Sequence, residues 1–265
     1  MKLIGFIGAG NMGCAMLKGA LGVFDAGQLT YTDASAERME YVKEQTGVEY
    51  TAGNRETVHS CRYLVLAIKP QYLGSVLDEI REDITKDHII ISILPGISIG
   101  SLKEELGEEV RIVRAMPNTP AMVNEGMTAV SLSNDIYTEE EKKTVCDFFG
   151  SFGKYEILEE RLMNASVGAI GSSPAYVYMF IEALADGAVK YGIPRDKAYK
   201  MAAQTVLGSA KMVLETGEHP GVLKDQVCSP GGTTIAAVSA LEECGFRSAV
   251  IKAADRCYEK TVTFK

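Results

Sequence analysis

The chain has 265 residues, which suggests one large domain or two modest ones, because domains usually run to about 100–200 residues. With 46% hydrophobic and 23% charged residues, it has the composition of a globular protein that buries a core. Lys and Arg number 27 and Asp and Glu number 35, so the formal net charge is −8. This acidic balance argues against general binding to nucleic acid or to an anionic membrane, since both require a basic surface.

The N-terminal sequence MKLIGFIGAG has neither the long apolar stretch nor the small-residue cleavage site of a signal peptide. No window approaches the run of about 20 apolar residues that a membrane span needs. The six cysteines are dispersed and form no CxxC, and His59 and Cys61 are the one close pair of His and Cys. This usage predicts no metal site and no structural disulfide, and it favours a reducing cytoplasm.

A glycine motif follows the first apolar run of the chain. Residues 2–7 (KLIGFI) are typical of a strand, and GAGNMG comes directly after them, at the start of a helical pattern over residues 11–21. Gly8, Gly10 and Gly13 therefore form GxGxxG at a strand-to-helix turn. In that context the glycines permit a tight turn, close approach to a pyrophosphate and close helix packing, and the motif predicts a dinucleotide site.

Strand and helix patterns alternate after this motif. Strands are expected at residues 29–32, 48–51, 63–68, 89–94 and 111–115, with helices at 35–45, 72–81 and 98–106. This alternation predicts βαβ units in a parallel sheet, and the continuously apolar runs indicate strands covered on both faces. A further strand at 127–131 and a helix from Glu139 complete it. The predicted fold class is α/β, with an N-terminal Rossmann-type doubly wound sheet over residues 1–160.

Ligands of such sheets lie at the carboxyl ends of the strands, where three polar segments fall. Asp33 lies twenty residues beyond Gly13, where an acid commonly binds the adenosine ribose of NAD, although Thr32 and Arg38 are compatible with NADP.

The other two segments are IKPQ and MPNTP. Lys69 either faces a phosphate or ribose or is a solvated surface lysine. In MPNTP, two prolines bracket Asn118 and Thr119, which is either a rigid way to present polar groups to a nicotinamide or a stiff connecting turn.

Residues 161–265 lack strand patterns and are predicted to form an all-α domain. One helix begins at Ser173 and Pro174, an N-cap candidate followed by a first-turn proline, and another spans residues 195–216 before Gly217. Helices this apolar in so short a segment indicate a dimer that packs helical domains together. The alternative is burial against the nucleotide-binding domain.

Residues 228–237 (CSPGGTTIAA) lead into a helical pattern over 233–243. Unpaired N–H groups at its start, with the hydroxyls of Ser229, Thr233 and Thr234, are suited to a small anion, and a carboxylate fits best. The alternative is an ordinary capped helix preceded by glycines.

Five segments together carry a family resemblance that spans essentially the whole chain. The sequence resembles the pyrroline-5-carboxylate reductases at GFIGAGNMG, LAIKP, AMPNTPAMVNEGMTA, GSSPAYVYMFIEALADGAV and LKDQVCSPGGTTIAAVSALE. The resemblance implies an oxidoreductase that reduces 1-pyrroline-5-carboxylate to L-proline with NADPH or NADH, in the last step of proline biosynthesis. It also implies a homodimer formed through an all-α C-terminal dimerisation domain, or a decamer of five such dimers.

The resemblance also implies roles for particular residues. For the cofactor these are Gly8, Ala9, Gly10, Asn11, Met12, Gly13, Thr32, Asp33, Asn54, Ala67, Lys69, Pro70, Met116, Pro117 and Asn118. For the substrate they are Val227, Cys228, Ser229, Gly231, Gly232, Thr233 and Thr234. The hydroxyl of Thr234 is implied to reach the ring nitrogen and is the expected catalytic residue. The family usually prefers NADPH, and Asp33 departs from what a strict NADPH enzyme would carry.

Two other functions fit parts of the sequence. GFIGxGNMG also opens β-hydroxyacid dehydrogenases, which use a lysine in the first long helix of the helical domain, whereas here Lys190 is the first lysine of that segment and lies near its end. A non-catalytic dinucleotide sensor could keep the glycine loop, but it would have no need of the 229–234 loop.

Overall fold

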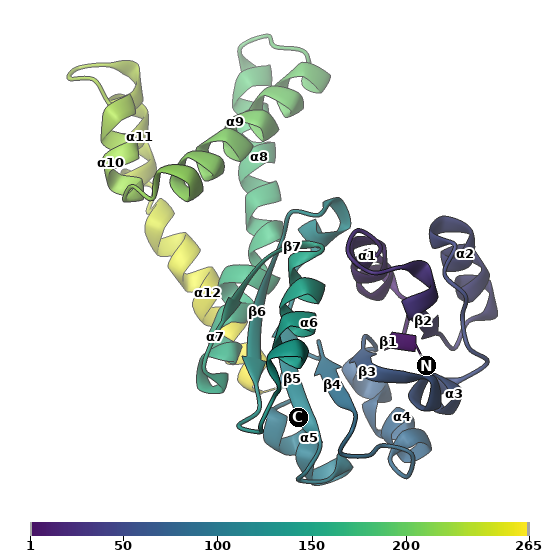
Figure 1. Ribbon diagram of the computed structural model, residues 1–265. Helices are drawn as coiled ribbons and strands as arrows, with labels where there is room; N and C mark the ends of the chain where they lie inside the picture. The colour runs from purple at the N-terminus through teal and green to yellow at the C-terminus, as the bar shows by residue number, and fades with distance from the viewer. Residues whose placement is uncertain (1, 264–265) are drawn as a thin grey trace. The chain divides into compact units, whose positions relative to one another are not determined.

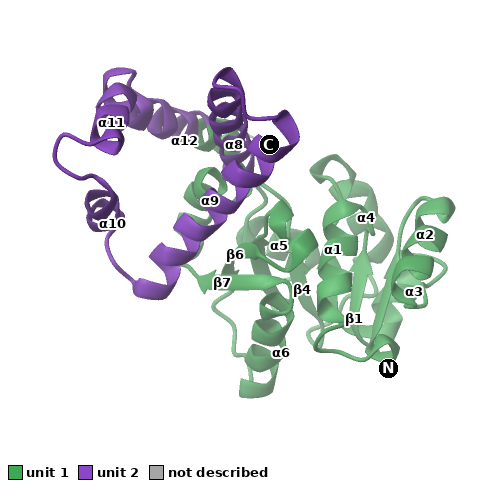
Figure 2. Ribbon diagram, turned by 90° about the horizontal axis from the view of Figure 1, so that it is seen from above, with its two compact units in different colours: residues 1–172, 257–265 green, residues 173–256 purple. Residues whose placement is uncertain are grey.

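The computed structural model describes residues 2–263 and divides into two compact units (Figure 2). One unit comprises residues 1–172 together with 257–265, and the other comprises residues 173–256. Residues after 160 add to the first unit, since Met163 and Val167 pack against Met116 and Ala129 of its sheet. The domain limits expected from the sequence, 1–160 and 161–265, stay a prediction.

The first unit is built on one seven-stranded sheet (Figure 1). Its strands are β1 (Lys2–Ile7), β2 (Leu29–Thr32), β3 (Cys61–Leu66), β4 (Ile89–Ser92), β5 (Arg111–Met116), β6 (Gly126–Leu132) and β7 (Gly153–Ile157). Their order in the sheet is β2-β1-β3-β4-β5-β6-β7. From β2 to β5 in this order, each strand is parallel to its neighbour. The predicted α/β fold with a doubly wound sheet is confirmed.

Helices cover both faces of this sheet, which explains its apolar strands. They are α1 (Asn11–Ala20), α2 (Ala36–Thr46), α3 (Asn54–Ser60), α4 (Leu73–Ile80), α5 (Ile99–Leu106), α6 (Glu139–Gly150) and α7 (Met163–Ser166). Short helical turns are η1 (Ala26–Gln28), η2 (Pro70–Tyr72), η3 (Thr119–Val123), η4 (Glu160–Leu162) and the π-helical η5 (Val167–Gly171). Tyr63 and Val65 of β3 belong to one apolar cluster, whereas Leu64 and Leu66 belong to a second. Successive strand residues therefore bury opposite faces.

The strand expected at residues 48–51 is wrong. The N–H of Thr51 bonds to the β2 backbone at the carbonyl oxygen of Tyr31 (2.9 Å), and the Thr51 hydroxyl donates to the same oxygen (3.4 Å). The Thr30 hydroxyl donates to the carbonyl oxygen of Glu49 (2.7 Å). The segment thus lies at the outer edge of β2 but does not form the repeated backbone hydrogen bonds of a paired strand. Val48 is buried because it packs in the apolar core, not because it belongs to a strand. Helix α3, which the sequence did not indicate, follows at once.

One pairing departs from the predicted parallel arrangement, because β6 runs antiparallel to β5. A parallel connection needs a crossover of about a dozen or more residues, and residues 117–125 are too few. The chain instead reverses through η3. After α6 it adds β7 parallel to β6, as an edge strand that the sequence did not indicate.

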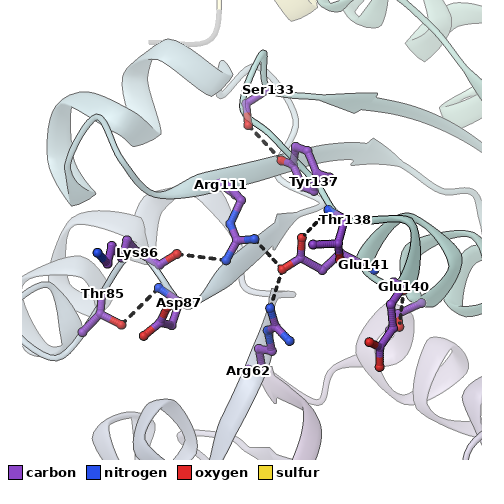
Figure 3. Close-up of polar contacts among 11 residues, drawn as sticks. Arg62, Thr85, Lys86, Asp87, Arg111, Ser133, Tyr137, Thr138, Glu140 and Glu141 are labelled. Carbon is purple, nitrogen blue, oxygen red and sulfur yellow. Dashed lines mark hydrogen bonds and ion pairs between the residues drawn. The ribbon is translucent and has the colours of Figure 1, made fainter.

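Glu141 fixes the first turn of α6 to the sheet, as Figure 3 shows. Its carboxylate accepts the backbone N–H of Thr138 at 2.8 Å, and the Thr138 hydroxyl accepts the N–H of Glu141 at 3.2 Å, which makes a capping box. The same carboxylate meets the guanidinium groups of Arg62 from β3 and Arg111 from β5. Glu141 is 1% exposed, so its charge is buried but fully paired.

The second unit is entirely helical in the described residues. Its helices are α8 (Ser173–Lys190), α9 (Arg195–Thr216), α10 (Pro220–Val227), α11 (Thr233–Glu243) and α12 (Phe246–Val262), of which α12 continues into the first unit. The predicted helices over 195–216 and 233–243 are confirmed, and Gly217 ends α9 in a left-handed conformation. Among the described residues, no helix has the length and apolar content needed to cross a membrane.

The helical unit buries few of its own apolar side chains. Its core cluster consists of Ala185, Ala198 and Ala202, with larger side chains only partly buried around them. Large apolar residues are left exposed on its helices, and those on α8, α9 and α12 include Tyr178, Met179, Leu184, Met201, Leu207, Met212, Leu214, Val250 and Ile251. Apolar helix faces on this scale are characteristic of protein–protein interfaces.

Candidate active site

The glycine motif forms a tight turn at the carboxyl end of β1. Gly8 has a φ of +98°, and its N–H donates to the carbonyl oxygen of Thr32 (2.9 Å). A Cβ at Gly8 would stand 2.6 Å from the carbonyl oxygen of Ala67, and one at Gly13 only 2.4 Å from that of Gly8. The first and third glycines therefore allow β1, β3 and α1 to approach closely.

Gly10 has a different role from its two neighbours in the motif. It is exposed, and a Cβ there would meet no atom within 4 Å. Gly10 is also the N-cap of α1, and it provides no side chain to bond the N–H groups of the first turn. These groups are oriented to bind an anion, so the loop has the shape and donors that the pyrophosphate of a dinucleotide requires.

A cavity of about 720 Å³ opens beside this turn in the first unit. Seven of the residues predicted to bind cofactor line it, namely Gly8, Gly10, Thr32, Asp33, Asn54, Ala67 and Lys69. They come from the ends of β1, β2 and β3 and from the start of α3. The sheet order changes direction here, because β1 lies between β2 and β3, and such a point is the usual ligand site of open α/β sheets.

Two charged residues bind the backbone N–H and the carbonyl oxygen of Ala9 in this loop. The Asp33 carboxylate accepts the N–H of Ala9 (2.8 Å) and the N–H of Ser35 (3.0 Å). Arg38 donates from Nε to the carbonyl oxygen of Ala9 (2.7 Å), and its guanidinium lies over the ring of Tyr41, 5.0 Å from the centroid. The end of β2 is thereby tied to the glycine loop.

The far wall of the cavity is formed by one face of the helical segment after β3. Tyr72, Ser75, Val76 and Glu79 line it, and Glu79 accepts a hydrogen bond from the Asn54 amide (2.7 Å). Sequence reasoning did not single these residues out. Their spacing of three, one and three is that of a single helix face, which is the signal that could have found them.

The remaining predicted cofactor residues do not line this cavity. Asn118 is 9% exposed, and its side chain bonds within the protein, donating to the carbonyl oxygen of Ile170 (3.2 Å) and accepting the N–H of Met127 (2.9 Å). Its amide ties η5 to the start of β6 and is not presented as a free polar group. Met116 and Pro117 are buried beside it. Of the others, Ala9 and Gly13 are buried, Met12 and Pro70 are partly buried, and Asn11 is exposed.

The predicted substrate residues form the turn between α10 and α11 of the second unit. Gly231 is left-handed, with a φ of +69°, and the N–H of Gly232 donates to the carbonyl oxygen of Ser229 (3.0 Å). Gly232 is the N-cap of α11 and provides no side-chain cap. Within residues 2–263, the first turn of α11 thus lacks the serine or threonine cap that the alternative interpretation required.

The hydroxyls at this turn differ in exposure. Ser229 and Thr233 are exposed, while Thr234 is half-buried. Cys228 is half-buried, and Val227, the last residue of α10, is 65% exposed. The turn therefore combines uncapped helix N–H groups with hydroxyl donors, which are the groups that an anion site without an arginine requires.

A second cavity, of about 880 Å³, lies around Ser131–Asp135 and Ile157–Arg161 of the first unit. Among its charged lining residues, Lys103 donates to the Asp135 carboxylate (2.9 Å) and Arg161 donates to the Glu159 carboxylate (2.6 Å). In the described part of the chain, no three His, Cys, Asp or Glu side chains gather as metal ligands would.

Comparison with known proteins covers both units. Residues 160–263 match a family model for pyrroline-5-carboxylate reductase dimerisation, and residues 3–96 match one for coenzyme F420-dependent NADP oxidoreductases. The helical part of the chain is thus matched as a dimerisation domain.

Curated relatives and solved structures agree with these matches. The pyrroline-5-carboxylate reductase of Escherichia coli is 49% identical, with 98% of this chain and 97% of that protein covered. The enzyme of Pisum sativum is 41% identical, over 97% of this chain and 95% of its own length. A crystal structure of Plasmodium falciparum pyrroline carboxylate reductase with NADP bound has a TM-score of 0.88 and 35% identity, covering 98% of this chain and 97% of that one. With this identity over nearly its full length, the chain belongs to the pyrroline-5-carboxylate reductase family.

Proposed function

We propose that this chain reduces 1-pyrroline-5-carboxylate to L-proline with NAD(P)H. The main support for the proposal is family membership over 98% of the chain. Two features of the structure agree with it, namely the open glycine turn in one unit and the SPGGTT turn without a side-chain cap in the other. A β-hydroxyacid dehydrogenase is not favoured, because Lys190 is the last residue of α8 and no other lysine lies in that helix.

The cofactor belongs at the 720 Å³ cavity in this proposal. The first turn of α1 binds its pyrophosphate, and Gly10 leaves room for that contact. Asp33, Asn54 and Lys69 line the same space and contact the sugars and phosphates. When bound, NAD(P)H supplies a hydride.

The substrate carboxylate is assigned to the turn between α10 and α11. The N–H groups at the start of α11 and the hydroxyls of Ser229 and Thr233 donate to it. The other proposed contacts at this turn are Val227, Cys228, Gly231 and Gly232. The hydroxyl of Thr234 bonds to the ring nitrogen and orients the C=N bond.

The reaction requires little acid–base chemistry from the protein. A C–H bond forms at the imine carbon, the C=N π pair becomes a lone pair on nitrogen, and a proton from water balances the product. Alignment of two reactants can account for about 7–11 kcal/mol of a barrier in favourable cases. Thr234 acts as an orienting donor and proton relay, since a threonine hydroxyl is too weak an acid to be the source of the proton.

We also assign the active form to a homodimer built from the helical units, and a decamer of five such dimers is its larger assembly. The matched dimerisation model and the exposed apolar faces of α8, α9 and α12 support the dimer. We place the enzyme in the cytoplasm, because the six cysteines are free thiols.

The test is an assay of purified protein with 1-pyrroline-5-carboxylate and each reduced cofactor. Loss of the absorbance of the reduced cofactor, with L-proline identified by mass spectrometry, is the expected result. A 3-hydroxy acid with oxidised cofactor serves as the competing substrate. Turnover of the hydroxy acid, or no proline with either cofactor, contradicts the proposal.

A further inference from the structure

We propose that this enzyme selects NADH over NADPH and that Asp33 sets the choice; this rests on the proposed function. Asp33 stands at the carboxyl end of β2 and lines the cavity with Thr32, Ala34 and Ala36. In sheets of this kind, the residue at that position contacts the adenosine ribose, where NADH has a hydroxyl and NADPH a phosphate. A carboxylate accepts a hydrogen bond from the first and repels the second.

The carboxylate is held in place by two backbone groups. Its two oxygens each accept an N–H, from Ala9 at 2.8 Å and from Ser35 at 3.0 Å. Rotation of Asp33 away from a phosphate would break both bonds. Because Ala9 is 1% exposed, its N–H would then have no water to replace the lost acceptor. The Asp33 side chain therefore cannot rotate away from a 2′-phosphate without disturbing the glycine loop.

Lys69 lines the cavity from the end of β3, whereas Arg38 is the cation on the same side as Asp33, and its contacts hold it at the loop. Its Nε donates to the carbonyl oxygen of Ala9 at 2.7 Å, and its guanidinium stacks on Tyr41. Asp33 and Arg38 thus bind two consecutive peptide groups of the loop, through the N–H and the carbonyl oxygen of Ala9. Arg38 acts here as a positioning residue for the loop, so its removal weakens both cofactors alike.

The experiment measures kcat/KM for NADH and for NADPH, together with the Kd of each cofactor from fluorescence titration without substrate. We expect the wild-type enzyme to favour NADH by about tenfold or more, which corresponds to about 1.4 kcal/mol. Asp33→Asn removes the charge and keeps one acceptor oxygen. We expect this variant to raise kcat/KM for NADPH about tenfold while changing that for NADH only a few-fold.

Two further measurements separate charge from shape. Added salt screens repulsion between exposed charges, so the wild-type NADPH-to-NADH ratio should rise with ionic strength and that of Asp33→Asn should not. Glu37→Gln, an exposed carboxylate on the first turn of α2 outside the cavity lining, is the matched control and should leave the ratio unchanged.

Several outcomes overturn the inference. They are a wild-type preference for NADPH, an unchanged ratio in Asp33→Asn, and a selective loss of NADPH binding in Arg38→Ala, which would assign the phosphate to Arg38. The proposed function fails separately. In that case neither cofactor supports proline formation, while the two Kd values still decide the preference.

Discussion

At Gly232, an added methyl group and the Ser229 hydroxyl would occupy the same space. A Cβ there would lie 2.4 Å from Ser229 Oγ and 3.1 Å from the Ser229 carbonyl oxygen. Gly232→Ala must therefore turn the serine hydroxyl away, at little cost to stability because Ser229 is exposed. We expect the KM for pyrroline carboxylate to rise about tenfold, as the loss of one hydrogen bond to a charged group implies, with kcat and cofactor Kd near wild type.

The matched comparison for Gly232→Ala is Ser229→Ala, which removes the same hydroxyl directly. If both act through one hydrogen bond, each raises KM to a similar extent and the double variant is no worse than either single one. Additive effects would show that the two residues act independently, and an unaltered KM in Gly232→Ala would contradict the proposed carboxylate site.

Thr234 is half-buried in the first turn of α11. In Thr234→Ala the ring nitrogen loses the donor that orients it. We expect kcat to fall about 10²-fold, the lower end of what a positioned proton-transfer group contributes. Thr234→Ser keeps the hydroxyl and should recover most of the loss, while cofactor Kd stays constant in both variants. Equal turnover in Thr234→Ala and the wild type removes Thr234 from the mechanism.

At the scale of elements, the sequence predicted best where the hydrophobic signal was unbroken. Strand 29–32 and helices 195–216 and 233–243 lie where their patterns placed them, and the strand expected at 89–94 is observed at Ile89–Ser92. Buried strands have continuous apolar runs, and Gly217 marks the end of α9, so these elements have local signals. Strand β7 was missed because its five residues include Lys154 and Glu156 and lie at an edge, so they form no apolar run.

Besides its buried Val145, Phe148 and Phe149, helix α6 attaches to the sheet through one buried acid. Burial alone raises the pKa of Glu141, but the Thr138 backbone N–H and the guanidinium groups of Arg111 and Arg62 outweigh it, so the pKa lies below the ordinary 4.5. A depressed folded-state pKa contributes stability that is present above the unfolded value and is lost as the pH falls through the folded value. The attachment therefore weakens in acid below about pH 4.5.

Glu141→Gln tests this attachment. It leaves two arginines facing a neutral group, and breaking such a buried cluster costs about 3–5 kcal/mol, less here because Arg62 is 41% exposed. We expect the free energy of unfolding at neutral pH to drop by about 2–3 kcal/mol. Urea melts between pH 7 and pH 4 should show a smaller loss for the variant than for the wild type. Parallel curves for the two proteins would exclude Glu141 as the titrating group. The exposed Glu139→Gln, on the same turn, is the control.

At the scale of the whole molecule, the sequence indicated the glycine turn and the SPGGTT turn, but not the helix face that lines the cavity beside the glycine turn. The glycine turn was predictable because GxGxxG after a strand fixes backbone geometry that side chains cannot replace. Asn118 was harder to predict, because only the fold reveals that Ile170 and Met127 use both ends of its amide. Two prolines can hold a polar side chain in place whether it faces a ligand or bonds within the protein, so the motif alone does not distinguish the two cases.

The exposed apolar helices make the oligomer a testable requirement of the fold. Leu214 at the end of α9 is 81% exposed and Ile251 in α12 is 62% exposed. Burial of such a side chain contributes about 1.5–3 kcal/mol, and in a twofold dimer each substitution counts twice. Leu214→Asp with Ile251→Asp should therefore raise the dimer dissociation constant at least about a hundredfold, seen by light scattering as the monomer mass at micromolar protein. Ile136→Asp, at a position 92% exposed in the sheet unit, is the control and should stay oligomeric. A double variant with the wild-type mass would place the interface elsewhere.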